Sequence, residues 1–235
     1  MGNETGDAQT LTVLACLWTG QVAVASWHHH RGTIAPPQPV VQPPSGLQWG
    51  AFTGNSSVLG SWKGVFIGDG DSFTQDFGQY RVPLVVYWES GFTAQQIQNG
   101  AADPYMKNWA KEMAAYGQPI IFAPLDEMNG NWNPYSGDPN AYKAAWVRIH
   151  GFFTGVPNVQ FAFDVNNDSV PATGGNGLTS YFPGSNFVDL VGVDGFDFGG
   201  QTWTQVFGTA LQTLKAAYPT KPLWILSTGS VDKHR

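Results

Sequence analysis

The sequence predicts an α/β fold, a (β/α)8 barrel of the TIM type, that is incomplete and has about seven strands. Short apolar runs alternate along the chain with longer segments whose apolar residues recur at helical spacing. The short runs do not alternate with polar residues, which is typical of parallel strands buried on both faces. A closed barrel needs eight such strands and about 250 residues. Only seven runs are found, so we expect a barrel that is one strand short.

The composition indicates a globular domain and excludes some functions. The chain has 235 residues, of which 42% are hydrophobic and 14% aromatic, and this is enough apolar material for a sizeable core. Its ten Trp residues favour a carbohydrate ligand, because Trp stacks on the faces of sugar rings. The net charge is −6, and the chain contains no basic run, so we expect no nucleic-acid partner. Cys16 is the only cysteine, so no internal disulfide can form.

Residues 1–26 are predicted to be a secretory signal segment, which implies a secreted protein. The apolar part from Leu11 to Ser26 is too short to span a bilayer, and Ala23-Val24-Ala25 fits a small-residue cleavage site. No Lys or Arg precedes Leu11, although signal segments carry positive charge there. Two other interpretations stay open. Cys16 is the lipid-bearing residue if the segment is a lipoprotein signal, and a start codon upstream of the true one gives the same pattern.

Residues 27–45 are predicted to be a Pro-rich linker, and residues 46–235 the barrel domain, truncated at its C-terminus. Repeated Pro in a polar stretch makes an extended spacer without a core. The linker also contains three adjacent histidines, His28–His30, which bind metals adventitiously in many proteins. We expect no metal site and no cofactor.

Each expected element of the domain carries local signals. The helices begin at Asp103-Pro104 and Asp138-Pro139, where an N-cap precedes Pro, and a third helix covers Thr204 to Ala217. The expected strands are bounded by turn residues. They are Gln48 to Phe52, Gly64 to Ile67, Leu84 to Trp88, Pro119 to Pro124, Val159 to Val165, Phe187 to Val193 and Leu223 to Leu226.

The run Pro119 to Pro124 ends at two acids, Asp126 and Glu127, and this position suggests catalysis. In a parallel barrel the C-terminal ends of the strands carry the chemistry. Asn129 and Trp132 follow at once and offer amide and aromatic surface to a sugar. The alternative is a structural one, in which Asp126 caps a turn and Glu127 is merely solvated.

Three segments resemble glycoside hydrolase family 26, the family of β-mannanases and some related β-glucanases and xylanases. Residues 125–132, Leu-Asp-Glu-Met-Asn-Gly-Asn-Trp, are similar to that family's signature at the fourth barrel strand. Residues 181–196 resemble its sixth-strand segment, and residues 221–230 its seventh. The matches occur in order and extend over the whole domain from about Gly46.

The resemblance implies a retaining, endo-acting hydrolase of a β-1,4-linked polysaccharide, with mannan as the expected backbone and the chain as a monomer. Glu127 matches the family's acid/base. The resemblance also implies substrate contacts from Trp88, Asp126, Asn129, Trp132 and Phe196, with Tyr135 as a further stacking candidate. Core packing or turn geometry is the structural alternative for each, and for Trp88 the two interpretations are equally weighted.

The sequence departs from the family at its second catalytic position. Ser227 stands where the nucleophilic glutamate belongs, and a hydroxyl without a base is a poor nucleophile. Asp126 replaces a usual His, and Phe196 a Tyr that supports the nucleophile. Glu89, Asp194 and Asp197 are weaker candidates for a second carboxylate. Activity is therefore expected to be impaired or lost if Ser227 is genuine, and the alternative function is a carbohydrate-binding pseudoenzyme or a non-functional fragment. A metal-dependent hydrolase is disfavoured, because the domain has few histidines.

Overall fold

A computed structural model describes residues 12–14, 48–52 and 60–230. The predicted linker 27–45, with His28–His30, lies outside these ranges, and so does Cys16. The predicted signal segment 1–26 also lies outside them, except for Thr12–Leu14.

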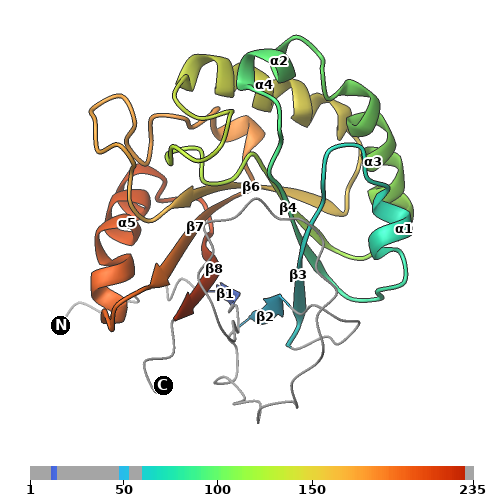
Figure 1. The fold of residues 1–235 in the computed structure, drawn as a ribbon. Helices are drawn as coiled ribbons and strands as arrows, with labels where there is room; N and C mark the ends of the chain where they lie inside the picture. The colour runs from blue at the N-terminus through green and yellow to red at the C-terminus, as the bar shows by residue number, and fades with distance from the viewer. Residues whose placement is uncertain (1–11, 15–47, 53–59, 231–235) are drawn as a thin grey trace, which may run out of the picture.

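The seven predicted strands are all present, are parallel and pair in chain order, as Figure 1 shows. Each apolar run becomes one strand, because parallel strands are covered on both faces. This confirms the predicted α/β barrel class with seven strands in the domain. The strands are β2 (Trp49–Phe52), β3 (Trp62–Phe66), β4 (Leu84–Trp88), β5 (Ile120–Pro124), β6 (Val159–Asn166), β7 (Leu190–Asp197) and β8 (Leu223–Ser230).

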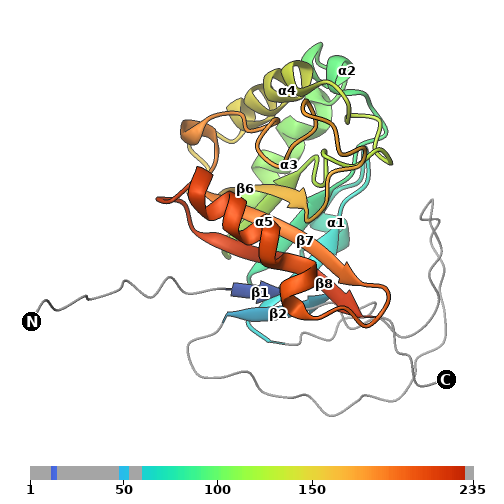
Figure 2. The ribbon, with the colours of Figure 1, turned by 90° about the vertical axis from the view of Figure 1, so that its left-hand side faces the viewer.

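A further strand of three residues, β1 (Thr12–Leu14), fills the gap between the first and last strands of the domain. It pairs in parallel with β2, where Val13 lies opposite Trp49, and with β8, where Val13 lies opposite Ile225. Figure 2 shows β1 beside β2 and below β8. The ring is thereby closed, and its eighth member comes from the range predicted as a signal segment.

The helices cover the outside of the sheet (Figure 1). The predicted start at Asp138 is confirmed, because its side chain accepts hydrogen bonds from the backbone N–H groups of Asn140 and Ala141, both at 3.0 Å. The first two helices have five residues each and were not predicted, because so short a segment shows little periodicity. The helices are α1 (Phe73–Phe77), α2 (Ala94–Gln98), α3 (Asp103–Tyr116), α4 (Pro139–Phe152) and α5 (Trp203–Ala217). Among the helices in the described ranges, none has the length and apolarity to cross a membrane.

Of the last two strands, β7 is shifted along the chain relative to its prediction, and β8 starts as predicted but is longer. β7 begins at Leu190, because Ser185–Phe187 form a single 3-10 turn. Both β7 and β8 continue past their apolar runs, to Asp197 and Ser230. A register shift between Val193 and Asp194 brings Asp194 opposite Ser227.

Two apolar layers hold the barrel together. The interior is filled by side chains that include Tyr87 and Leu226, and the outer layer packs Trp88 and Trp109 between the sheet and the helices. Successive strand residues point to opposite faces, so Tyr87 and Trp88 belong to different layers. Near the C-terminal ends of β6 and β7 the buried side chains become polar, as at Asp164 and Asp194, and these residues lie toward the mouth of the barrel.

Candidate active site

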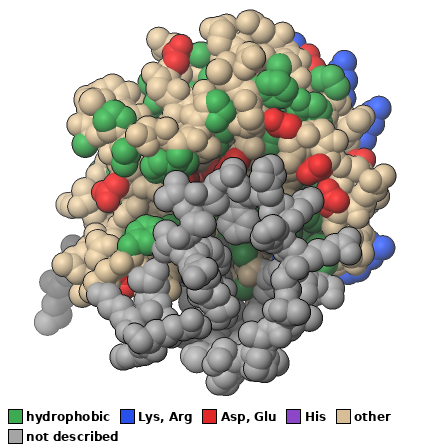
Figure 3. Space-filling model, viewed as in Figure 1, with side chains coloured by type: hydrophobic (Ala, Val, Ile, Leu, Met, Phe, Trp, Pro, Cys, Tyr) green, Lys and Arg blue, Asp and Glu red, His purple; other side chains and the backbone are tan. Residues whose placement is uncertain are grey.

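Carboxyl side chains gather at the C-terminal ends of four consecutive strands. In barrels of this type that face carries the chemistry. Figure 3 shows acidic side chains near the middle of the molecule. The group consists of Glu89 after β4, Asp126 and Glu127 after β5, Asp164 on β6 and Asp194 on β7.

The chain turns sharply after β5, and this turn positions Glu127. Leu125 (φ 56°) and Glu127 (φ 51°) are the non-glycine residues in the described ranges with positive φ. Such a conformation costs about 1–3 kcal/mol per residue and persists only where the surroundings enforce it. Here the N–H of Glu127 donates to the carbonyl of Asp164 (3.0 Å), and the hydroxyl of Tyr142 donates to the carbonyl of Leu125 (3.1 Å). The strained turn is therefore held in one position.

The carboxylate of Glu127 accepts two side-chain hydrogen bonds. Asn166 Nδ2 donates to Oε1 at 2.9 Å, and Trp132 Nε1 donates to Oε2 at 3.0 Å. Burial raises the pKa of Glu127, while the two hydrogen bonds act in the opposite direction because they favour the charged form. The net upward shift keeps Glu127 protonated at a higher pH than an ordinary glutamic acid, as a general acid requires.

Asn129 orients Asn166 and is itself fully buried. Its Nδ2 donates to the carbonyl of Asn166 (2.9 Å), and its Oδ1 accepts from the N–H of Asn166 (2.9 Å). The structure thus places Asn129 behind Asn166, where it fixes the donor to Glu127. Asn166 was not predicted. The available signal was its position at the end of an apolar strand beside the one that carries Glu127.

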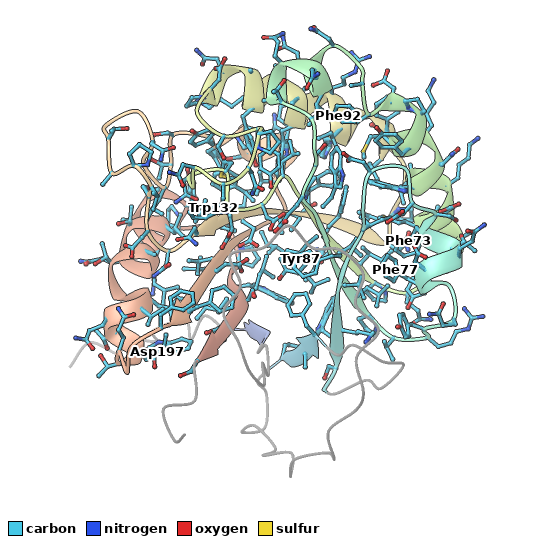
Figure 4. The ribbon with its side chains drawn as sticks, in the orientation of Figure 1. Phe73, Phe77, Tyr87, Phe92, Trp132 and Asp197 are labelled. Atoms are coloured by element: carbon cyan, nitrogen blue, oxygen red, sulfur yellow. The ribbon has the colours of Figure 1, made fainter. Side chains whose placement is uncertain are left out.

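Trp132 lies over Gly130 and remains 46% exposed. A Cβ atom at Gly130 would lie 2.3 Å from the indole of Trp132, so only glycine lets the ring fold back far enough to reach Glu127. Figure 4 shows Trp132 at the upper side of the mouth. The arrangement joins an exposed aromatic surface to the carboxyl group of Glu127.

Asp164 and Asp194 form a buried carboxyl pair beneath Glu127. Neither carboxyl oxygen of Asp164 has a hydrogen-bond partner among the described residues, and the charge of Asp164 adds to the rise in the pKa of Asp194. Burial is the main reason that the pKa of each lies well above its ordinary value. Gly192 makes room for the pair, since a Cβ there would lie 2.5 Å from Asp164 Oδ1.

Ser227 lies on β8 directly opposite Asp194 and is 5% exposed. Its backbone N–H donates to the Asp194 carboxyl group, which opposes the rise in the pKa of that group. The structure therefore brings the position of the expected nucleophile next to a carboxyl group, but the side chain at that position is a hydroxyl.

Asp126 is also buried at the mouth, with 2% exposure, and its Oδ1 accepts no hydrogen bond. Burial, followed by the charges of Glu89 and Glu127, raises its pKa well above the ordinary value. The hydroxyl of Tyr135, which is fully buried, donates to the backbone carbonyl of Asp126 at 2.9 Å. Tyr135 thus supports the turn from behind.

Two predicted aromatic contacts lie differently in the structure. Trp88 is fully buried in the outer layer, where its Nε1 donates to Asp69 Oδ1 (2.8 Å) and its ring meets Trp109 edge-on at 5.5 Å. Of its two interpretations, the described packing is that of a core residue. Phe196 is partly buried on β7, and its ring lies 6.0 Å from that of Phe198.

An aromatic group that sequence reasoning missed lies at the ends of β2, β3 and β4. Phe52, Phe66 and Tyr87 have ring centroids 5.1–5.2 Å apart. Tyr87 is buried, and its hydroxyl donates to the carbonyl of Leu226 (2.7 Å), whereas Phe66 is 54% exposed. Figure 4 places Tyr87 at the centre of the barrel. The position of Phe66 at a strand end was the available signal.

The remaining candidate acids occupy the rim. Glu89 is exposed after β4, and partial withdrawal from water together with the charge of Glu127 raises its pKa. Asp197 at the end of β7 is engaged by the following loop, whose backbone N–H groups lower its pKa to about 2. Across the described ranges, His, Cys, Asp and Glu side chains nowhere form a group of three suited to a metal ion.

Comparison with known sequences identifies relatives. The sequence profile of glycosyl hydrolase family 26 matches residues 79–218. Endoglucanase H of Acetivibrio thermocellus is 38% identical over 170 residues, which are 63% of this chain and 18% of that protein. Mannan endo-1,4-beta-mannosidase A and B of Caldalkalibacillus mannanilyticus is 30% identical over 105 residues, or 39% of this chain and 19% of that protein. The chain thus spans less than a fifth of either relative.

Solved structures share the barrel fold. A GH26 beta-mannanase from Bacteroides ovatus superimposes with a TM-score of 0.57 and 17% identity, over 73% of this chain and 63% of that one. The GH26 domain of an endo-beta-mannanase/endo-beta-glucanase from Prevotella bryantii gives 0.56 and 15%, over 74% and 69%. At these identities the likeness supports the fold.

Proposed function

Because the chain belongs to glycosyl hydrolase family 26, we propose that the mouth of the barrel binds a β-1,4-linked polysaccharide, with mannan as its backbone. We assign Glu127 as the acid/base of an endo-acting glycoside hydrolase. The supporting observation is the environment of Glu127, a carboxyl group on a strained turn with a raised pKa and two fixed donors. The exposed rings of Trp132 and Phe66 supply the aromatic surface on which sugars stack.

In the proposed retaining reaction, Glu127 acts twice. A carboxylate nucleophile first forms a bond to the anomeric carbon, while Glu127 gives its proton to the departing glycosidic oxygen. Glu127 then takes a proton from the water that hydrolyses the glycosyl intermediate. Trp132 and Asn166 keep its carboxyl group in place during both proton transfers.

Ser227 limits this reaction. A serine hydroxyl is a poor nucleophile unless a base removes its proton, and its side chain is shorter than that of glutamate. We therefore propose that hydrolysis by this sequence is strongly impaired. The alternative is a sugar-binding pseudoenzyme. It is favoured by the retention of exposed aromatic surface at Trp132 and Phe66 where the nucleophilic carboxylate is absent.

Restoring the carboxylate tests the proposal. The double variant Ser227→Glu with Phe196→Tyr should release reducing sugar from mannan at least about 10³-fold faster than the original chain, because nucleophile loss costs several orders of magnitude. Mixed-linkage glucan and xylan, assayed in parallel, test the choice of mannan. Adding Glu127→Gln to the double variant should abolish the gain. A double variant that folds but hydrolyses none of the three polysaccharides contradicts the assignment.

Small anions and affinity gels separate impaired enzyme from pseudoenzyme. Azide or formate restores turnover of the original chain if only one carboxylate is missing. Retention on a mannan gel without turnover at any azide concentration supports the pseudoenzyme. If the chain is neither retained on the mannan gel nor active with azide or formate, both the impaired enzyme and the pseudoenzyme are excluded.

We also propose that the protein is a monomer and that it acts outside the cell, where long polysaccharides occur. The extracellular location depends on the predicted signal segment or, in the open alternative, on a lipid at Cys16. Secretion with an N-terminus at Ser26 supports a signal peptide, whereas incorporation of labelled fatty acid that is lost in Cys16→Ala supports a lipoprotein.

A further inference from the structure

Exposed aromatic side chains in the described ranges are confined to one face of the molecule. Their exposed fractions are 54% for Phe66, 46% for Trp132, 65% for Phe198 and 47% for Trp203. Phe66 ends β3, Trp132 follows β5, Phe198 follows β7, and Trp203 begins α5. All four therefore lie at the C-terminal ends of the strands, on the face that carries Glu127. Two of them, Phe198 and Trp203, lie in the loop after β7 and at the first residue of α5, and the proposed reaction uses neither.

This loop and the end of β8 line an open pocket of about 330 Å³. Its apolar wall is formed by Trp203, Val206 and Phe207. The rings of Trp203 and Phe207 lie 4.5 Å apart, and because Phe207 is buried it supports the exposed indole from behind. Gln201 and Thr228 contribute an amide and a hydroxyl to the lining.

Asp197 fixes the shape of the loop. Its Oδ1 accepts hydrogen bonds from the backbone N–H groups of Gly199 (2.9 Å), Gly200 (2.6 Å) and Gln201 (2.7 Å). Its Oδ2 accepts from the hydroxyl of Ser230 at 3.0 Å. Since these bonds already engage both carboxylate oxygens, the role of Asp197 is structural. Figure 4 places Asp197 on the same side of the barrel as Trp132, and below it.

The lining selects a class of ligand. The lining contains no Lys, Arg or His that could pair with an anionic ligand. Its one carboxylate, that of Asp197, is already hydrogen-bonded to the loop backbone and to Ser230. An aromatic plane beside neutral donors and acceptors suits an uncharged ring with an apolar face and hydroxyl edges. The volume lies at the lower end of the roughly 300–1,000 Å³ typical of small-ligand pockets, which suits one or two sugar rings.

We propose that the loop from Asp197 to Trp203, with the end of β8, is a second sugar-binding site for neutral β-linked polysaccharide, outside the cleft at Glu127. The choice of a sugar rests in part on the proposed function. Ser227 and Ser230 are three residues apart on β8, or roughly 10 Å. One long polysaccharide chain can therefore reach both the cleft and this second site.

The test measures affinity for mannohexaose and cellohexaose by calorimetry with the full chain. Trp203→Ala should weaken binding of the preferred hexasaccharide about tenfold, whereas Trp203→Phe, which keeps an aromatic plane, should retain affinity within about twofold. Val147→Ala, which removes an exposed apolar side chain from α4, serves as the control and should bind like the original chain. Circular dichroism verifies that each variant is folded.

The result also separates this proposal from the catalytic one. Three results overturn the second site. Trp203→Ala binds as tightly as the original chain, or Trp203→Phe loses as much affinity as Trp203→Ala. The third is that the original chain binds neither hexasaccharide. If the double variant at Ser227 and Phe196 shows no hydrolysis while binding still depends on Trp203, the hydrolase proposal fails and the second site stands.

Discussion

Gly130 leaves the space in which the indole of Trp132 reaches Glu127. Gly130→Ala would place a methyl group about 2.3 Å from that ring, so the ring must move outward. The change should break the Trp132 hydrogen bond that favours the carboxylate form, so the pKa of Glu127 should rise further. Carbon-13 NMR titration of the Glu127 carboxyl group measures this shift, and the tryptophan fluorescence should change with it.

Gly174→Ala is the matched control, because a Cβ atom there meets nothing within 4 Å. It should leave both the titration of Glu127 and the fluorescence unchanged. Stability should fall little in Gly130→Ala, since the displaced group is an exposed side chain rather than buried backbone. An unchanged pKa of Glu127 in Gly130→Ala would show that the indole does not influence the acid.

Single residues also show where sequence reasoning ends. The position of Glu127 at the mouth of the barrel was predictable, because it follows an apolar run that forms a parallel strand. The layer in which Trp88 lies was not predictable. The run Leu84–Trp88 is apolar on both faces, so its sequence does not show which side chains point into the barrel and which point outward. The pairing of Asp164 with Asp194 was not predictable either. It depends on which side chains of β6 and β7 point into the barrel. The role of Asn129 depends on the neighbouring strand that carries Asn166, and spacing along the chain does not specify either contact.

At the level of elements, the long segments were predictable and the short ones were not. The strands β4 and β5 follow their apolar runs closely, and the N-cap at Asp138 starts α4 as expected. The strand β1 escaped prediction, because three residues carry no periodic signal and their apolar surroundings resemble a signal segment. Only pairing with two distant strands makes them a strand.

The strand β1 therefore makes a prediction that separates its two possible roles. Deleting residues 1–26 removes β1 and leaves unpaired the edges of β2 and β8 that face it. We expect a lower Tm, by roughly 2–4 °C for each kcal/mol lost, and faster hydrogen exchange in β8. Deleting residues 1–10 keeps β1 and is the control. If both deletions give the same Tm and the same exchange in β8, β1 contributes nothing to the barrel in solution, and the signal-segment interpretation is favoured.

For the molecule as a whole, the buried acids link stability to pH. Burial raises the pKa of Asp126, Asp164 and Asp194 well above the ordinary value, so the folded chain binds more protons than the unfolded chain above about pH 4. The free energy of unfolding should therefore fall as the pH rises through the raised pKa values, by about 1.4 kcal/mol per pH unit for each proton concerned. Asp103 and Asp197 have lowered pKa values and act in the opposite direction at low pH.

Asp164→Asn tests this linkage, because the amide keeps the shape of the side chain in a site that Gly192 shows to be tightly packed. Removing one titrating group should flatten the decline in the free energy of unfolding above about pH 4, by up to about 1.4 kcal/mol per pH unit. Urea denaturation at several pH values measures the decline. Val147→Ala, which removes no titrating group and lies at an exposed position on α4, should leave it unchanged. At the pH values where Asp194 ionises, the Asp164→Asn variant should also be more stable than the original chain, because Asp194 then has no charged neighbour at position 164. An identical decline in Asp164→Asn and the original chain would mean that the pair titrates alike in the folded and unfolded chains, which is incompatible with two carboxyl groups buried against each other.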